Sequence, residues 1–221
     1  MGHLKGIATY AFRGTGKFVL ITIIVLSIVM ELAQFANLLG LLAILFISAY
    51  FAAIYFQLVQ SSAVGDADAP DFPDTANLIE DLFVPMLHML MVALVSFGPL
   101  VFYTALTPAD DLHGGIVIGL LALGIIYYPM GMLAVVVLGS ILALNPLIVI
   151  PSIFRSGWLY WLGIGMLCVL YIAGSVIESQ LGGSLIVGTL VQAAIGGYTF
   201  MTNARILGII YREREEELAW V

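Results

Sequence analysis

The sequence predicts an all-α fold, a polytopic transmembrane helical bundle of about six spans with a broken or re-entrant segment near residues 129–154. Composition carries this prediction, because 62% of the 221 residues are hydrophobic and only 10% are charged, whereas soluble domains carry about 25% charged residues. The mean hydropathy is +1.12, and long apolar runs alternate with short polar ones. We therefore expect a single integral membrane domain over residues 1–221.

The net charge and the absence of known motifs argue against several classes of function. The formal net charge is -7, and nucleic-acid binding needs clustered Lys and Arg, so we expect no nucleic-acid partner. The single cysteine, Cys168, excludes an intramolecular disulfide. The sequence contains no His-Glu-x-x-His zinc motif, no nucleophile elbow and no phosphate-binding loop. These observations predict a protein that is not an enzyme and that holds no cofactor and no metal.

The N-terminal segment, residues 1–17, is expected to lie on the membrane surface ahead of the first span. Leu4, Ile7, Ala8 and Ala11 fall on one face of a helix over residues 3–13. This spacing is typical of a short interfacial helix whose apolar side rests on the lipid.

The first two spans are predicted at about residues 18–38 and 39–59, joined near Asn37. Glu31 and Gln34 share one face of the first span. An ionisable side chain that faced lipid would be costly. We therefore interpret Glu31 as a protonated or hydrogen-bonded group between helices. An ion or substrate path past Glu31 and Gln34 is the open alternative.

An acidic loop and a short helix follow over residues 61–83 and are expected in the cytoplasm. Prolines interrupt the loop, so it cannot be helical or embedded in the membrane. Its carboxylates suit either a solvated loop or a calcium site, although the spacing of an EF-hand is missing. The helix ending at Phe83 would rest its apolar positions on the membrane surface. The carboxylates belong to Asp66, Asp68, Asp71 and Asp74.

A third span is predicted at residues 84–106, with a kink at Gly98-Pro99. His88 lies just inside it and is interpreted as an interfacial hydrogen-bonding residue, because no second His or Cys stands at metal-ligand spacing.

The central stretch, Gly114 to Phe154, contains no charged residue and no histidine. A straight helix of this length would extend roughly 60 Å, twice the roughly 30 Å hydrocarbon layer. It must therefore bend, re-enter or cross twice, and the candidate breaks are Pro129 and Asn145-Pro146. Because a break at Asn145 and Pro146 frees backbone carbonyls that need partners, both residues are candidates for lining a cavity.

Two more spans are predicted at residues 158–177 and 184–203. The first begins with interfacial aromatic residues such as Trp158. Gln192, in the second, is a further candidate cavity residue. Residues 205–221 are predicted to form a charged cytoplasmic tail, for which a solvated helix and a partner-binding surface are both open interpretations.

The basic residues decide the predicted orientation. All seven fall into three groups. If the central stretch makes one net crossing, the three groups share one side of the membrane, which the positive-inside rule assigns to the cytoplasm. We therefore expect a multi-pass protein of the prokaryotic cytoplasmic (inner) membrane with both termini cytoplasmic. The groups are Lys5, Arg13 and Lys17; Arg155; and Arg205, Arg212 and Arg214.

Several short segments carry a resemblance to a known family. They are Ser62-Ala63-Val64-Gly65, Pro70-Asp71-Phe72-Pro73-Asp74, Tyr128-Pro129-Met130, Ala143-Leu144-Asn145-Pro146 and Arg205-Ile206-Leu207-Gly208. Together they resemble an uncharacterised family of prokaryotic polytopic membrane proteins, a domain of unknown function that is distantly similar to Yip-type membrane proteins. The segment from Asp81 to Pro85 is similar to the Asp-Leu-Tyr-Gly-Pro signature of Yip proteins but departs from it at Phe83 and Val84. The resemblance implies a polytopic membrane fold and no particular substrate.

Two functions fit these observations. The first is a non-enzymatic integral membrane protein that organises or assists a partner complex, because the acidic loop and the charged tail are the largest polar surfaces. The alternative is a small transporter or lipid-handling protein whose polar intramembrane cavity is lined by Glu31, Gln34, Asn145 and Gln192. The expected partners are the lipid bilayer and either another membrane protein or a second copy of the chain.

Overall fold

The computed structural model describes residues 6–74, 76–181 and 185–220, and within these ranges it is helical without a strand. Seven α-helices are joined by short 3₁₀ or π-helical turns, labelled η, which confirms the predicted all-α class. The elements are η1 (Tyr10–Phe12), α1 (Gly16–Ala33), α2 (Asn37–Val64), η2 (Ile79–Phe83), α3 (Val84–Leu106), η3 (Ala109–Asp111), α4 (Gly114–Leu138), η4 (Ile141–Leu144), α5 (Pro146–Arg155), α6 (Gly157–Leu181) and α7 (Leu185–Leu218).

Five helical segments in the described part of the chain are long and apolar enough to cross a membrane, and they confirm a polytopic helical bundle. The predicted sixth span corresponds to the first half of α7, and its first residue lies outside the described ranges. The five segments are Gly16–Ala33, Asn37–Val64, Ile79–Leu106, Gly114–Leu138 and Gly157–Ile177.

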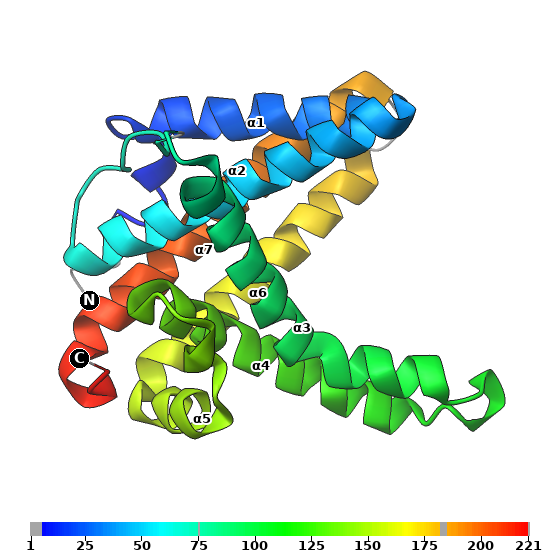
Figure 1. Cartoon of the computed structure of the whole chain (residues 1–221), viewed down its shortest axis with the longest axis vertical. Helices are drawn as coiled ribbons and strands as arrows, with labels where there is room; N and C mark the ends of the chain where they lie inside the picture. Colours follow the sequence, from blue (N-terminus) through cyan, green and yellow to red (C-terminus); the bar gives the residue numbers. More distant parts are fainter. Residues whose placement is uncertain (1–5, 75, 182–184, 221) are drawn as a thin grey trace.

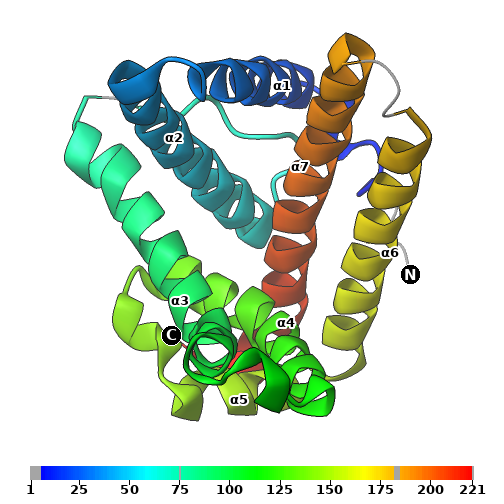
Figure 2. The same cartoon turned by 90° about the vertical axis from the view of Figure 1, so that its right-hand side faces the viewer.

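The long helices are arranged as three antiparallel pairs: α1 with α2, α3 with α4, and α6 with α7 (Figure 1). The α3–α4 pair diverges from the other two pairs: in Figure 2 the first part of α3 descends obliquely from beside α2, and its later part and α4 are seen nearly end-on. Gly163 of α6 approaches Ile206 of α7, and Gly174 approaches Ile195, which fixes α6 and α7 as antiparallel neighbours.

Helices α2 and α7 form the centre of the molecule. Leu58, Val59, Ala204 and Leu207 are at most 1% exposed in this contact. Gly208 lets the two backbones approach closely, because a Cβ at this position would lie 2.7 Å from the carbonyl oxygen of Val59. Small residues at helix contacts stabilise membrane proteins, because helices that approach closely make more dispersion contacts.

The N-terminal segment contacts α7. Only Tyr10–Phe12 are helical there, so the helix predicted over residues 3–13 is wrong for the described residues, and residues 1–5 lie outside them. The ring of Tyr10 is buried beneath the guanidinium group of Arg205, 4.6 Å from the ring centroid. The hydroxyl of Tyr198 donates a hydrogen bond to the carbonyl of Ala8.

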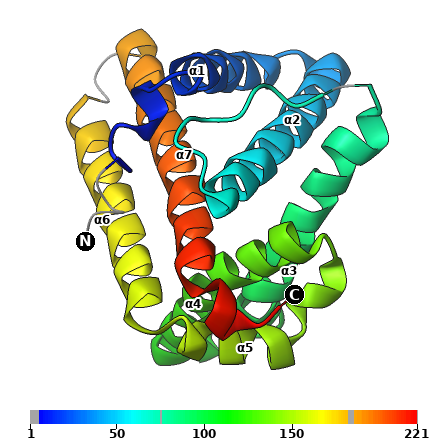
Figure 3. The same cartoon turned by 90° about the vertical axis from the view of Figure 1, so that its left-hand side faces the viewer.

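The short helix predicted before Phe83 is present as the π-helical turn η2, and its placement on the membrane surface stays a prediction. The turn η2 runs directly into α3, and its residues Leu82 and Phe83 pack against Ala49 and Ala53 of α2. Residues 65–74 cross the face shown in Figure 3 before this turn.

The central stretch contains one long helix and one short helix. Helix α4 continues through Pro129 and ends at Gly139, whose φ is +63°, so Pro129 is not the predicted break. The Tyr160 hydroxyl donates a hydrogen bond to the carbonyl of Ile126, in the turn that Pro129 disturbs. The ten residues of α5 rise only about 15 Å, too little to cross the membrane. One long helix plus a short segment therefore replaces a second full span.

The charged tail is not a fully solvated helix, because part of it packs against α5. Helix α7 kinks at Arg214, whose backbone is not helical, and ends at Leu218, which is fully buried. The indole of Trp220 stacks on Tyr211 and donates a hydrogen bond to the Ser152 hydroxyl of α5 at 2.9 Å. Arg214 pairs with Glu217 at 2.8 Å on the exposed side. The tail is therefore docked on α5 by its apolar residues and keeps its charges outside.

Candidate functional site

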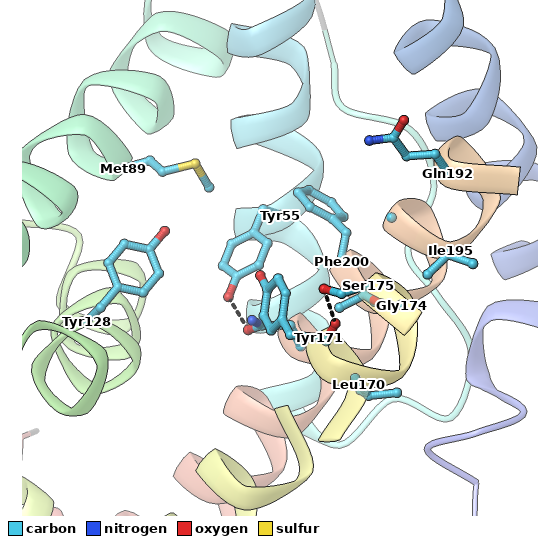
Figure 4. Close-up of a pocket in the computed structure, with 13 residues that line it drawn as sticks. Tyr55, Met89, Tyr128, Leu170, Tyr171, Gly174, Ser175, Gln192, Ile195 and Phe200 are labelled. Carbon is cyan, nitrogen blue, oxygen red and sulfur yellow. Dashed lines mark hydrogen bonds between the residues drawn. The ribbon is translucent and has the colours of Figure 1, made fainter. Parts of the chain in front are cut away.

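A cavity of about 410 Å³ lies where α2, α3, α4, α6 and α7 meet. It is partly open to the surroundings, and Figure 4 shows side chains from all these helices projecting into it. The volume is in the usual range for small-molecule sites, roughly 300 to 1,000 Å³. Its lining consists of Tyr55, Met89, Tyr128, Leu170, Tyr171, Gly174, Ser175, Gln192, Ile195, Gly196, Thr199, Phe200 and Asn203.

Helix α7 supplies the polar stripe of this cavity. Gln192, Gly196, Thr199 and Asn203 line it at helical intervals of three and four residues, so all four fall on one face. Eleven residues separate Gln192 from Asn203, which places the two amides roughly 16 Å apart along the helix axis. The polar stripe therefore extends over about three turns of α7.

Two hydrogen bonds fix the polar groups of the cavity. The Tyr55 hydroxyl donates to the Oδ1 atom of Asn203 at 2.7 Å, and the Ser175 hydroxyl donates to the carbonyl of Tyr171 at 2.9 Å. Both hydroxyl protons are therefore donated in hydrogen bonds within the protein. Because a hydroxyl oxygen also accepts, the lone pairs of Tyr55 and Ser175 stay available to a ligand.

Aromatic rings form the remaining wall. Tyr55 and Phe200 meet edge to face, with ring centroids 5.2 Å apart, and Tyr128 packs against Phe97 at 5.8 Å. Tyr128, Tyr171 and Asn203 also line a second, more apolar cavity of about 610 Å³. The two cavities meet at these three side chains, so a polar compartment adjoins an apolar one.

Charge is missing from the described lining of both cavities, because neither contains Asp, Glu, Lys, Arg or His. Throughout the described residues, no cluster of three or more His, Cys, Asp or Glu is close enough to hold a metal ion. The arrangement offers hydroxyls, amides, one thioether and π faces, which bind polar and weakly hydrated groups by hydrogen bonding and dispersion.

The structure places the predicted candidate residues in different parts of the molecule. Gln192 lines the cavity. Glu31 lies in the last turn of α1 and Gln34 is exposed at its end, away from both cavities. Asn145 and Pro146 begin α5: the Asn145 Oδ1 atom accepts a hydrogen bond from the Leu147 amide at 2.9 Å. These four residues therefore do not line either of these two cavities, and a role for them at another cavity or at a partner contact stays a prediction.

The acidic loop does not gather its carboxylates. Asp66 accepts a hydrogen bond from the Ser61 hydroxyl at 3.0 Å, and Asp68 lies against Gly14. Asp74 accepts one from the backbone amide of Ala76 at 3.0 Å. These three residues and Asp71 are exposed. The carboxylates face solvent separately and present a negative surface at the end of the bundle.

Sequence reasoning missed the tyrosines and Asn203. Tyr55, Tyr128 and Tyr171 come from three different helices, and their meeting depends on the packing of those helices. Asn203 could have been predicted from the sequence, because it lies on the same face of α7 as Gln192 and Thr199 at helical spacing. A polar stripe within an apolar helix is the signal that points to it.

Comparison of the chain with protein-family models, with curated proteins and with solved structures gave no match. Two of the segments that carried the resemblance, 62–65 and 205–208, meet in space: Arg205 donates a hydrogen bond to the Ser62 hydroxyl at 3.2 Å, and Gly208 packs against Ser62. The resemblance to Yip-type membrane proteins stays a prediction.

Proposed function

We propose that this integral membrane protein is a non-enzymatic lipid-handling protein that holds a lipid-like molecule in the cavity between α2, α3, α4, α6 and α7. The observation that carries the proposal is the adjacency of two compartments. Hydroxyls and amides line the first cavity, and the second, which shares Tyr128, Tyr171 and Asn203, is mostly apolar. An amphipathic molecule matches both, with its polar group in the first and a chain in the second.

The position of the polar groups supports this proposal. Unsatisfied amides and hydroxyls are costly inside a membrane and are retained where they contact a ligand, water or each other. Tyr55 and Asn203 satisfy one another, whereas the Gln192 side chain projects toward the cavity in Figure 4. A bound polar head would supply hydrogen-bond partners to the exposed Gln192 amide.

Lipid retention by the purified chain tests the proposal. Gln192→Ala and Asn203→Ala should reduce the amount of lipid that remains bound in native mass spectrometry at least several-fold. Gln34→Ala and Asn77→Ala are matched controls, because both residues are exposed and lie outside the cavity. Equal retention of lipid by all four variants and the unmodified chain would contradict the proposal.

Organisation of a partner complex is the second proposed function. Its support is the set of exposed carboxylates at Asp66, Asp68, Asp71 and Asp74, which offer a negative surface to a basic segment of another membrane protein or a second copy. Reversing the charge by Asp68→Lys and Asp71→Lys should remove a cross-linked partner band from membranes. A band that survives both substitutions counts against this role.

We further propose the prokaryotic cytoplasmic membrane as the location, with both ends of the chain in the cytoplasm. The support is the distribution of charge: the described Lys and Arg residues lie just before or at the start of α1, at the end of α5 and in the C-terminal half of α7. These segments gather at the end of the bundle opposite the α1–α2 and α3–α4 turns (Figure 1), and the positive-inside rule assigns that end to the cytoplasm.

A further inference from the structure

The first cavity, between α2, α3, α4, α6 and α7, has the features of a site that binds a cation between aromatic rings. The faces of aromatic rings carry negative potential, and an ammonium group within about 6 Å of a ring centroid is attracted to it. Tyr55 and Phe200 stand at 68° to one another, so their rings form two sides of a corner. Figure 4 shows Tyr171 beside this corner and Tyr128 facing it across the cavity.

The oxygen atoms in the cavity strengthen this preference. The protons of Tyr55 and Ser175 are directed to Asn203 and to the Tyr171 carbonyl. Their oxygen atoms therefore meet a ligand as acceptors, which suits a group that donates hydrogen bonds or carries polarised C–H bonds. The Met89 sulfur adds a polarisable surface on the α3 side.

The absence of charge from the described lining limits the ligand class. A phosphate or carboxylate needs Arg or Lys in such a site, and a small metal cation needs carboxylate oxygens that replace its water. Neither is present among the described lining residues. An alkylammonium group is weakly hydrated for its charge, so rings and neutral oxygens suffice to bind it.

We propose that the cavity recognises its ligand through an alkylammonium group, held between the rings of Tyr55, Tyr171 and Phe200. The inference rests on the proposed lipid-handling function and names the chemistry of the polar head. The group can belong to a lipid headgroup or to a free organic amine, since both present the same cation to the cage. The second, apolar cavity takes an attached chain in the first case and is not used in the second.

A pair of isosteres tests the charge requirement. The full-length chain is placed in nanodiscs of phosphatidylglycerol, which lacks an ammonium group, and its thermal unfolding is followed with choline or with 3,3-dimethylbutan-1-ol. The two probes share a shape, but only choline is charged. We expect choline to bind at least tenfold more tightly, as judged from the concentration that raises the unfolding temperature. Equal affinities for the two probes would overturn the inference.

Nanodiscs of phosphatidylcholine distinguish the two sources. Stabilisation by these discs without an effect of free choline identifies the lipid headgroup, and stabilisation by free choline identifies a soluble amine. Either result supports the inference. If neither stabilises the chain while Gln192→Ala still reduces lipid retention, the inference fails and the lipid-handling proposal stands. If lipid retention is also unaffected, both fail.

Ring substitutions locate the site. Tyr171→Leu and Phe200→Leu should weaken choline or phosphatidylcholine binding at least fivefold, and Tyr171→Phe should retain most of it because the π face remains. Phe102→Leu is the matched control, since Phe102 is 69% exposed on α3 and outside this cavity. A loss equal to that of Phe200→Leu in the Phe102→Leu chain would contradict the assigned location.

Discussion

Arg205 joins three segments that are distant in the sequence. Its guanidinium group donates hydrogen bonds to the Asp66 carbonyl at 2.6 Å and to the Ser62 hydroxyl at 3.2 Å, and it covers the ring of Tyr10. Hydrogen bonds from a charged donor contribute more than neutral ones, about 1.5 to 3 kcal/mol. Arg205 thereby connects the N-terminal segment and the acidic loop to α7. From the sequence we used Arg205 only to predict the orientation in the membrane, and the structure shows that it also stabilises the fold.

Tyr10 gives a pH-dependent prediction at the residue scale. Burial raises the pKa of Tyr10 above its ordinary value of 10.0. The native state therefore favours the neutral phenol, and this contribution to stability is complete below about pH 10 and is lost as the pH rises through the raised pKa. Tyr10→Phe should reduce the loss of thermal stability between about pH 9.5 and 11, measured as the unfolding temperature in detergent.

Neutral pH supplies the control for this substitution. The buried Tyr10 hydroxyl lies near Ser61 and Ser62 but forms no hydrogen bond of ordinary geometry with a described residue. Removing it should therefore change the free energy of unfolding at pH 7 by less than about 1 kcal/mol. Unfolding curves of the variant and the unmodified chain that fall together at both pH values would refute the assignment of the pH effect to Tyr10.

Helix α5 shows how a short element is held in place. Its N-terminus is capped by Asn145, with Pro146 in the first turn, where a missing amide does no harm. The Tyr127 hydroxyl donates to the Leu144 carbonyl at 2.5 Å just before it. Trp220 contacts Ser152 from the other side. These contacts fix α5 between α4 and the tail of α7 without a long span.

Removal of the cap is the prediction at the element scale. Asn145→Ala should cost about 1 kcal/mol of local stability, because the Leu147 amide loses the Oδ1 acceptor. Hydrogen exchange of the Leu147 amide should become about fivefold faster. Asn77→Ala is the matched control, since the hydrogen bond of Asn77 to Asp81 uses its backbone amide and survives the substitution. Unchanged exchange at Leu147 would show that the cap is dispensable.

The whole molecule has one end that gathers the described basic residues together with the acidic loop, and another formed by helix turns. Residues 65–74, α5 and the docked tail lie at the first end, and the turns after α1 and α3 lie at the other (Figures 1 and 3). The α3–α4 pair diverges from the remaining helices. Because the cavities adjoin α3, α4, α6 and α7, this divergence is what leaves room for them.

Sidedness is the prediction at this scale. In a Cys168→Ser background, Asp110→Cys should react with a membrane-impermeant maleimide in intact cells. Asp71→Cys and Glu216→Cys should react only after the membrane is opened, because the positive-inside rule places their end in the cytoplasm. Exposure of all three positions allows labelling. Reaction of Asp71→Cys and Asp110→Cys from the same side would overturn the arrangement.

Hydropathy and length made the long helices predictable, and turn residues made the approximate ends predictable. A turn precedes α2 at Asn37, and the chain breaks at Asn145, which caps α5, as predicted. Helix α2 continues to Val64, so the prediction that the loop begins at residue 61 is wrong. Pro129 does not break α4, because a proline removes one backbone hydrogen bond and such a loss is tolerated inside a membrane helix. The apolar face of η2 suits a membrane and the flank of α2 equally well, and Leu82 and Phe83 lie against α2.

The sequence by itself determined that this chain is a membrane-embedded helical bundle and that its basic residues belong to few segments, because both follow from the local cost of placing polar groups in lipid. Only the tertiary structure decided which polar residues converge. Tyr55, Tyr128 and Tyr171 share a cavity with Gln192 and Asn203, while Glu31 and Asn145 do not, because periodicity assigns a residue to a helix face but does not determine which helix that face will meet.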